Sequence, residues 1–139
     1  MIVFLSCVKS KRKRRCEAQE MYISDLFIKS LQYAKQLKPT AIYILSAKYG
    51  LLKLNDMIEP YELTLNNMTE KQRKMWACKV IKQCQQKGIN FNDKAIFLCG
   101  KHYRKYVMTK FKNSQAPLSH LGIGKQLQFY KNNIKSERH

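Results

Sequence analysis

The sequence predicts a single α/β domain with a mostly parallel sheet of about four strands and helices on both faces. Short apolar runs without polar alternation, such as Ile2–Ser6, are typical of strands buried on both sides. They alternate with longer segments in which apolar residues recur at helical spacing, a pattern that indicates βαβ units. The 139 residues, 45% of them hydrophobic, suffice for one core. We place this domain at residues 1–135 and expect a frayed tail at 136–139.

The N-terminal half is expected to contain two strands separated by a helix. The first strand, Ile2–Ser6, leads into a basic loop over residues 8–20. Ser24 is a suitable N-cap for a helix with apolar residues at three- and four-residue spacing, and Pro39 ends that helix. The second strand is the apolar run over residues 41–45.

The C-terminal half continues the alternation of strands and helices. Thr69 to Gln72 matches a capping box that opens a helix, and Gly88 closes that helix. The elements expected after the second strand are an irregular segment at 48–68, a helix at 69–86, a strand at 94–99, a helix at 101–111, a short strand at 116–118 and a last helix at 122–134.

Positive charge dominates the composition. The chain has 27 Lys and Arg against nine Asp and Glu, a formal net charge of +18. Residues 94–136 hold nine basic residues and no acid, and residues 9–15 hold six basic residues in seven positions. Because this self-repulsion is relieved by a polyanion, nucleic acid or a nucleotide is the expected partner. The alternative is that the lysines serve solubility or reflect an AT-rich genome.

Cysteine spacing and hydropathy predict a cytoplasmic protein. The five cysteines are odd in number and no pair has CxxC spacing, so we expect reduced thiols. The apolar N-terminal run is too short for a signal peptide, and no segment approaches the roughly 20 apolar residues of a membrane span. His102 and His120 have no carboxylates near them in the sequence, so we predict no metal site, and no cofactor is expected.

Small residues and lysines recur where the predicted strands end. Ligands of open parallel sheets bind outside the carboxyl ends of the strands. Small residues let an anion approach backbone N–H groups and lysine neutralises phosphate, so these ends predict a pocket for a phosphate, a nucleotide or a nucleic-acid backbone. The candidate ligand-binding residues are Ser6, Cys7, Lys9, Tyr49, Gly50, Gly100, Lys101, Tyr103, Gly122, Gly124 and Lys125.

Each of these signals also has a plainer interpretation. Cys7 fits a buried structural thiol as well as a nucleophile activated by Lys9. Lys101 fits a solvated lysine, and Gly122–Lys125 fits a simple turn into a helix. No GxxxxGK[ST] motif occurs, so ATP hydrolysis of the P-loop type is disfavoured.

A second polar cluster supplies the candidate catalytic residues, which are Ser46, Lys48, Tyr61 and Glu62. A carboxylate among lysines stays ionised, so Glu62 suits a general base or a ligand for a ribose hydroxyl. Tyr61, together with Tyr49, suits stacking on a base. Alternatively, Glu62 pairs with a lysine and the two tyrosines pack against the core.

Six motifs together resemble a known domain family. They are Ser6–Lys9, Met21–Phe27, Ser46–Leu52, Ile58–Leu63, Gly100–Tyr103 and Gly122–Gln126. In this order they are similar to a bacterial and phage domain of unassigned function, itself similar to the family of the peroxide-stress protein YaaA. That resemblance implies DNA binding and protection from oxidative damage. Ala47 stands where YaaA-like sequences have glycine, and Lys48 adds a charge beside it, so the resemblance assigns neither a ligand nor a reaction.

Two hypotheses follow for the function. The first is a nucleotide- or nucleic-acid-acting protein of YaaA-like type, with Lys48 and Lys101 holding phosphate at the strand ends. If this pocket is catalytic, the reaction is group transfer or cleavage at a nucleoside or base. The alternative is a non-catalytic, salt-sensitive DNA- or RNA-binding protein that uses its basic surface. Replacing Glu62 with Gln would impair the first protein and spare the second.

Overall fold

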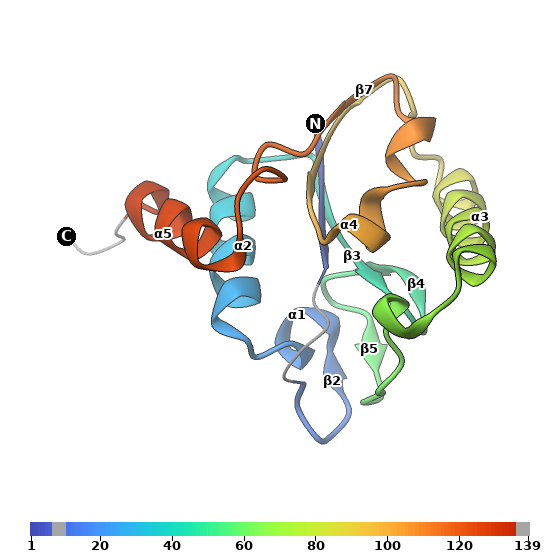
Figure 1. The fold of residues 1–139 in the computed structure, drawn as a ribbon, viewed down its shortest axis with the longest axis horizontal. Helices are drawn as coiled ribbons and strands as arrows, with labels where there is room; N and C mark the ends of the chain where they lie inside the picture. Colours follow the sequence, from blue (N-terminus) through green and yellow to red (C-terminus); the bar gives the residue numbers. More distant parts are fainter. Residues whose placement is uncertain (7–10, 136–139) are drawn as a thin grey trace.

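The computed structural model describes residues 1–6 and 11–135. Its centre is a five-stranded sheet in the order β4-β3-β1-β6-β7 (Figure 1). Strands β1, β3, β6 and β7 are parallel, and β4 runs antiparallel to β3. The predicted α/β class and mostly parallel sheet are confirmed, with five strands instead of about four. The strand bounds are β1 Ile2–Ser6, β3 Ala41–Ser46, β4 Gly50–Lys53, β6 Lys94–Leu98 and β7 Asn113–Gln115.

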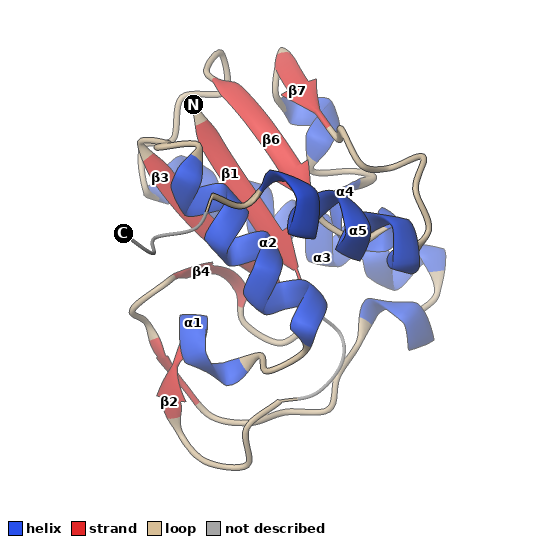
Figure 2. Ribbon diagram, turned by 90° about the vertical axis from the view of Figure 1, so that its left-hand side faces the viewer, coloured by secondary structure: helices blue, strands red, loops and turns tan. Residues whose placement is uncertain are grey.

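Helices cover both faces of the sheet, as predicted. Helices α2 and α5 lie against one face, and α3 and α4 lie on the other (Figures 1 and 2). Because side chains alternate along a strand, β1 directs Phe4 towards the core on the α3 side and Leu5 towards the core on the α2 and α5 side. The helix bounds are α2 Asp25–Gln36, α3 Glu70–Gln86, α4 Lys101–Arg104 and α5 Ile123–Asn133.

Side-chain caps begin α2 and α3 at the predicted positions. Ser24 Oγ accepts a hydrogen bond from the N–H of Phe27 at 3.3 Å. Thr69 and Gln72 form the reciprocal capping box at the start of α3. Gly88, just beyond α3, has a φ of 71°, the left-handed conformation that ends many helices. Local capping chemistry therefore sets these helix ends.

The hairpin of β3 and β4 was not predicted, because residues 48–68 were expected to be irregular. Gly50 opens β4 with a φ of 78°, a region that favours glycine. Gln83 of α3 then accepts a hydrogen bond from Leu51 N–H at 2.8 Å and donates one to the Tyr49 carbonyl at 3.1 Å. The hairpin is thus fixed by a side chain more than thirty residues away in sequence.

Several short elements also differ from the prediction. The expected loop over residues 8–20 contains β2 and α1, and β2 pairs with β5 in a small second sheet. The helix expected over 101–111 is α4 followed by a 3-10 turn, and the strand expected at 116–118 lies earlier, as β7. Segments of two to four residues are too short to show a hydrophobic period. Their bounds are β2 Cys16–Glu17, α1 Ala18–Met21, β5 Met57–Ile58, η1 Leu65–Asn67 and η2 Met108–Lys110.

Candidate functional site

A chain of hydrogen bonds lies at the carboxyl end of β3. Ser46 is fully buried, and its Oγ donates to the Tyr61 hydroxyl at 2.9 Å. The same Oγ accepts from Tyr49 N–H at 3.0 Å, and the hydroxyls of Tyr61 and Tyr22 are 2.6 Å apart. The Ser46 carbonyl accepts from the indole N–H of Trp76 at 2.9 Å. Two of the four candidate catalytic residues therefore form one network with each other, joined by Tyr22, which the sequence analysis did not select.

The tyrosine rings at this end pack edge to face. Tyr61 lies between Tyr22 and Tyr49, with ring centroids 6.5 Å and 5.8 Å away. The Lys11 ammonium stands 4.7 Å from the centroid of the Tyr61 ring, and that of Lys48 stands 5.3 Å from the centroid of Tyr49. These are cation–π distances, so two basic side chains are held at the mouth of the network. The arrangement matches the alternative in which the tyrosines pack against the core, and stacking on a base stays a prediction.

Glu62 and Lys48 are both exposed. Within the described part of the chain, no hydrogen bond or ion pair joins Glu62 to Ser46, Tyr61 or any lysine. The two exposed residues thus flank the buried network formed by the other two catalytic candidates.

The ends of β1 and β6 are joined directly. Ser6 Oγ accepts a hydrogen bond from Gly100 N–H at 3.1 Å. Cys99 Sγ donates to the Phe4 carbonyl at 3.1 Å, and burial raises the pKa of this thiol far above its ordinary value. Since β1 lies between β3 and β6, Ser46, Ser6 and Gly100 follow one another along the same edge of the sheet. The predicted convergence of strand ends is present for these three residues.

Other candidates lie elsewhere or serve the core. Tyr103 is only 2% exposed, accepts from Leu65 N–H at 3.4 Å and packs against Trp76, so it is a core residue. Gly50 shapes the β3–β4 hairpin. Gly122, Gly124 and Lys125 are exposed at the start of α5. Cys7 and Lys9 lie outside the described residues.

A cavity of about 180 Å³ opens beside the end of β6. It contains Gly100 and Lys101 from the predicted set, but its other polar residues were not predicted. The signal was weak in sequence, because these residues come from three separate segments with no common motif. The cavity is lined by Phe97, Leu98, Cys99, Gly100, Lys101, Arg104, Leu118, Ser119, Gln126 and Tyr130.

A basic groove of about 380 Å³ lies next to the tyrosine network. It is lined by Ile23 and by four consecutive basic residues, Lys11, Arg12, Lys13 and Arg14. Arg12 Nε donates to the Glu20 carbonyl at 2.8 Å, which fixes the segment. Lys11 belongs both to this groove and to the Tyr61 contact, so the groove adjoins the carboxyl edge of the sheet. The basic run of the sequence is therefore concentrated on one surface.

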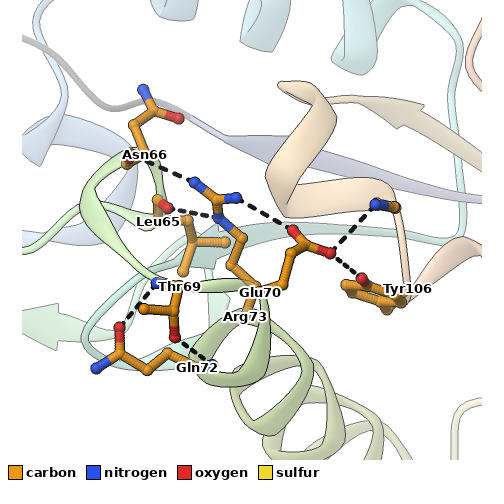
Figure 3. Close-up of polar contacts among 8 residues, drawn as sticks. Leu65, Asn66, Thr69, Glu70, Gln72, Arg73 and Tyr106 are labelled. Atoms are coloured by element: carbon orange, nitrogen blue, oxygen red, sulfur yellow. Dashed lines mark hydrogen bonds and ion pairs between the residues drawn. The ribbon is translucent and has the colours of Figure 1, made fainter.

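Glu70 organises a polar cluster at the start of α3 (Figure 3). Its carboxylate accepts from the Tyr106 hydroxyl, from Arg73 Nη1 at 3.1 Å and from Lys105 Nζ at 3.2 Å. The Tyr106 hydrogen bond, followed by those from Arg73 and Lys105, lowers the pKa of Glu70 to about 2. Arg73 also donates to the Leu65 carbonyl at 2.8 Å. Every charge in this cluster has a protein partner, which indicates a structural role.

Metal, disulfide and membrane features were searched within the described ranges. No three His, Cys, Asp or Glu side chains there are grouped to hold a metal ion. Cys16, Cys78, Cys84 and Cys99 are free thiols. No helix in residues 1–6 or 11–135 is long and apolar enough to cross a bilayer.

Comparison with known proteins identifies a family without a known activity. The model of a family of unknown function, DUF6884, matches residues 2–132. No curated protein matches the chain. The similarity to YaaA-like proteins and the phage association stay predictions.

Proposed function

Because the chain belongs to DUF6884, a family of unknown function, we propose from its own surface that it binds the phosphates of nucleic acid or nucleotides at the carboxyl edge of its sheet. The observation that carries the proposal is the groove lined by Lys11, Arg12, Lys13 and Arg14 beside the tyrosine network. Four adjacent cations attract a polyanion, and binding releases its condensed counterions.

The charge around the groove supports a phosphate ligand over an acidic or neutral one. Lys13 and Arg14 are exposed, with no hydrogen bond or ion pair among the described residues. Arg15 is the exception in this segment, since its Nε lies 3.9 Å from Glu59. Lys48 adds a further exposed cation near Tyr49. A surface that carries unpaired cations and one acid gains most from a ligand with several negative charges.

Binding is better supported than catalysis. Ser46 is buried and its Oγ is engaged in two hydrogen bonds, so it is held as a scaffold atom. Glu62 is exposed, a poor environment for a tuned general base. Group transfer or cleavage at a nucleoside or base therefore ranks second, and the resemblance to YaaA-like proteins makes DNA the first probe.

The proposal is tested by fluorescence anisotropy with labelled single-stranded and duplex DNA over a salt series. We expect the wild type to lose affinity steeply between about 50 and about 200 mM salt. Lys13→Gln/Arg14→Gln should weaken binding by roughly tenfold or more at low salt and flatten the salt dependence by up to two phosphate contacts, about 0.7–0.9 in slope each. Lys82→Gln/Lys87→Gln removes the same charge from exposed positions of α3 and its end and should have a much smaller effect.

Equal losses in the two double variants would contradict the groove and leave only diffuse attraction to the net charge. Absence of binding by the wild type to DNA, RNA and mononucleotides at low salt would contradict the proposal as a whole.

A further inference from the structure

The cavity at the end of β6 contains polar donors that the protein leaves without acceptors. Arg104 Nε is buried and has no hydrogen-bond partner. Tyr130 is only 2% exposed, and its hydroxyl makes no hydrogen bond within the described part of the chain. Both residues line the cavity. Buried polar groups are nearly always paired, and those that are not are expected to meet a ligand, an ion or water.

The lining selects an anion. Lys101 and Arg104 supply two positive charges, and Ser119 and Tyr130 supply hydroxyl donors. Burial raises the pKa of Tyr130 well above its ordinary value, so the phenol stays protonated and can donate. No Asp or Glu lines the cavity. A guanidinium with an ammonium beside it suits the oxygen atoms of a phosphate group.

The size of the cavity restricts which phosphate can enter. About 180 Å³ is the liquid volume of roughly six water molecules and lies below the ~300–1,000 Å³ of pockets for whole small ligands. This space takes one phosphate group and the start of its sugar, and it leaves no room for a strand that continues in both directions. A phosphomonoester carries about −1.5 to −2 charge at neutral pH, which matches two cations better than the single charge of a phosphodiester.

We propose that the cavity beside β6 binds a terminal phosphate, the phosphomonoester of a nucleotide or of a nucleic-acid end, through Arg104, Lys101 and Tyr130. The nucleotide part of this assignment rests on the proposed function. The phosphate part rests on the cavity alone. The cavity is distinct from the basic groove, since the two share no lining residue.

The direct test is calorimetric titration with adenosine 5′-monophosphate, adenosine and inorganic phosphate. The wild type should bind the monophosphate and fail to bind adenosine. Arg104→Gln should weaken monophosphate binding by about 10- to 100-fold, and Tyr130→Phe by about 3- to 10-fold, since hydrogen bonds to a charged group are lost. Lys131→Gln removes one charge from the exposed side of the same helix as Tyr130 and should change binding less than about twofold. Thermal unfolding of each variant establishes that it is folded.

Three outcomes would overturn the assignment. They are equal monophosphate binding by Arg104→Gln and Lys131→Gln, binding of adenosine as tight as that of its monophosphate, and binding of inorganic phosphate without binding of the monophosphate. The last result would identify free phosphate as the ligand and exclude a nucleotide.

A second arm separates this inference from the proposed function. Two oligonucleotides of the same sequence, with a 5′-phosphate or a 5′-hydroxyl, are compared by anisotropy, and a 3′-phosphate version tests the other end. The wild type should prefer a phosphorylated end, and Arg104→Gln should lose that preference. Lys13→Gln/Arg14→Gln should weaken both and keep the preference. DNA binding without any end preference would overturn the inference and leave the proposed function intact, whereas monophosphate binding without DNA binding would do the reverse.

Discussion

The carboxyl ends of β3 and β6 lie on one edge of the same sheet, separated only by β1, yet their polar groups are in opposite states. At β3, Ser46 Oγ and the Tyr61 hydroxyl are linked to each other and to further partners. At β6, Arg104 Nε and the Tyr130 hydroxyl have no partner among the described residues.

This difference separates two uses of polar residues that look alike in sequence. A buried network in which each member is paired rigidifies the fold and has little free energy left for a ligand. A buried donor without an acceptor costs stability in the empty protein, and a ligand that supplies the acceptor recovers that cost. The β3 end is therefore expected to respond to mutation through stability, and the β6 end through binding.

The largest effect should come from Gly50→Ala, which attacks the support of the β3 end. A Cβ would lie 2.2 Å from Gln83 Oε1, and φ would stay at 78°. Moving Gln83 breaks its two hydrogen bonds to the hairpin, so we expect a loss of about 2–4 kcal/mol in the free energy of unfolding, measured by chemical denaturation. Gly124→Ala is the matched control, because it lies in α5 with open space around it and should gain about 0.5–1 kcal/mol. A loss below that of an ordinary surface change would show that the hairpin tolerates a rearranged Gln83.

Ser46→Ala tests the network itself. It leaves Tyr49 N–H and the Tyr61 hydroxyl without their shared partner, so the free energy of unfolding should fall by about 1–3 kcal/mol. Monophosphate affinity should stay within about twofold, because no residue of the β6 cavity is touched. Ser119→Ala, at an exposed serine of that cavity, should leave stability unchanged. If Ser46→Ala abolished ligand binding in a protein that is still folded, Ser46 would belong to the site.

Arg104→Gln should show the opposite sign at the β6 end. The side chain gives up a buried charged donor that has no acceptor, so stability without ligand should be unchanged or higher by up to about 1 kcal/mol. Thermal melts with and without adenosine 5′-monophosphate measure this, and the ligand should raise the melting temperature of the wild type more than that of the variant. A clear loss of stability without ligand would mean that Arg104 is a structural residue and would remove the contrast between the two ends.

The sequence predicted the fold better than the site for a physical reason. Strand β1 and the caps at Ser24 and Thr69 depend on neighbouring residues, so local patterns were sufficient. The strand-end serines were found because topology alone places them along one edge. Whether a polar group is paired depends on residues distant in sequence, such as Gln83 on the hairpin or Tyr130 beside Arg104. No local motif records that, and the cavity was therefore only half predicted.

Glu70 supplies a third case, a cation cluster whose counter-charge comes from the protein. Hydrogen bonds from Tyr106, Arg73 and Lys105 lower its pKa from 4.5 to about 2, so its ionised form contributes stability above pH 4.5. That contribution should disappear as the pH falls from about 4.5 to about 2. The free energy of unfolding of Glu70→Gln should therefore be lower than that of the wild type at neutral pH, and the gap should close across this window in denaturation curves. Glu62→Gln, at an exposed acid with no described partner, should show no such gap. The effect will be the smallest of the four, since Glu70 faces solvent, and a gap independent of pH would assign it to packing instead of charge.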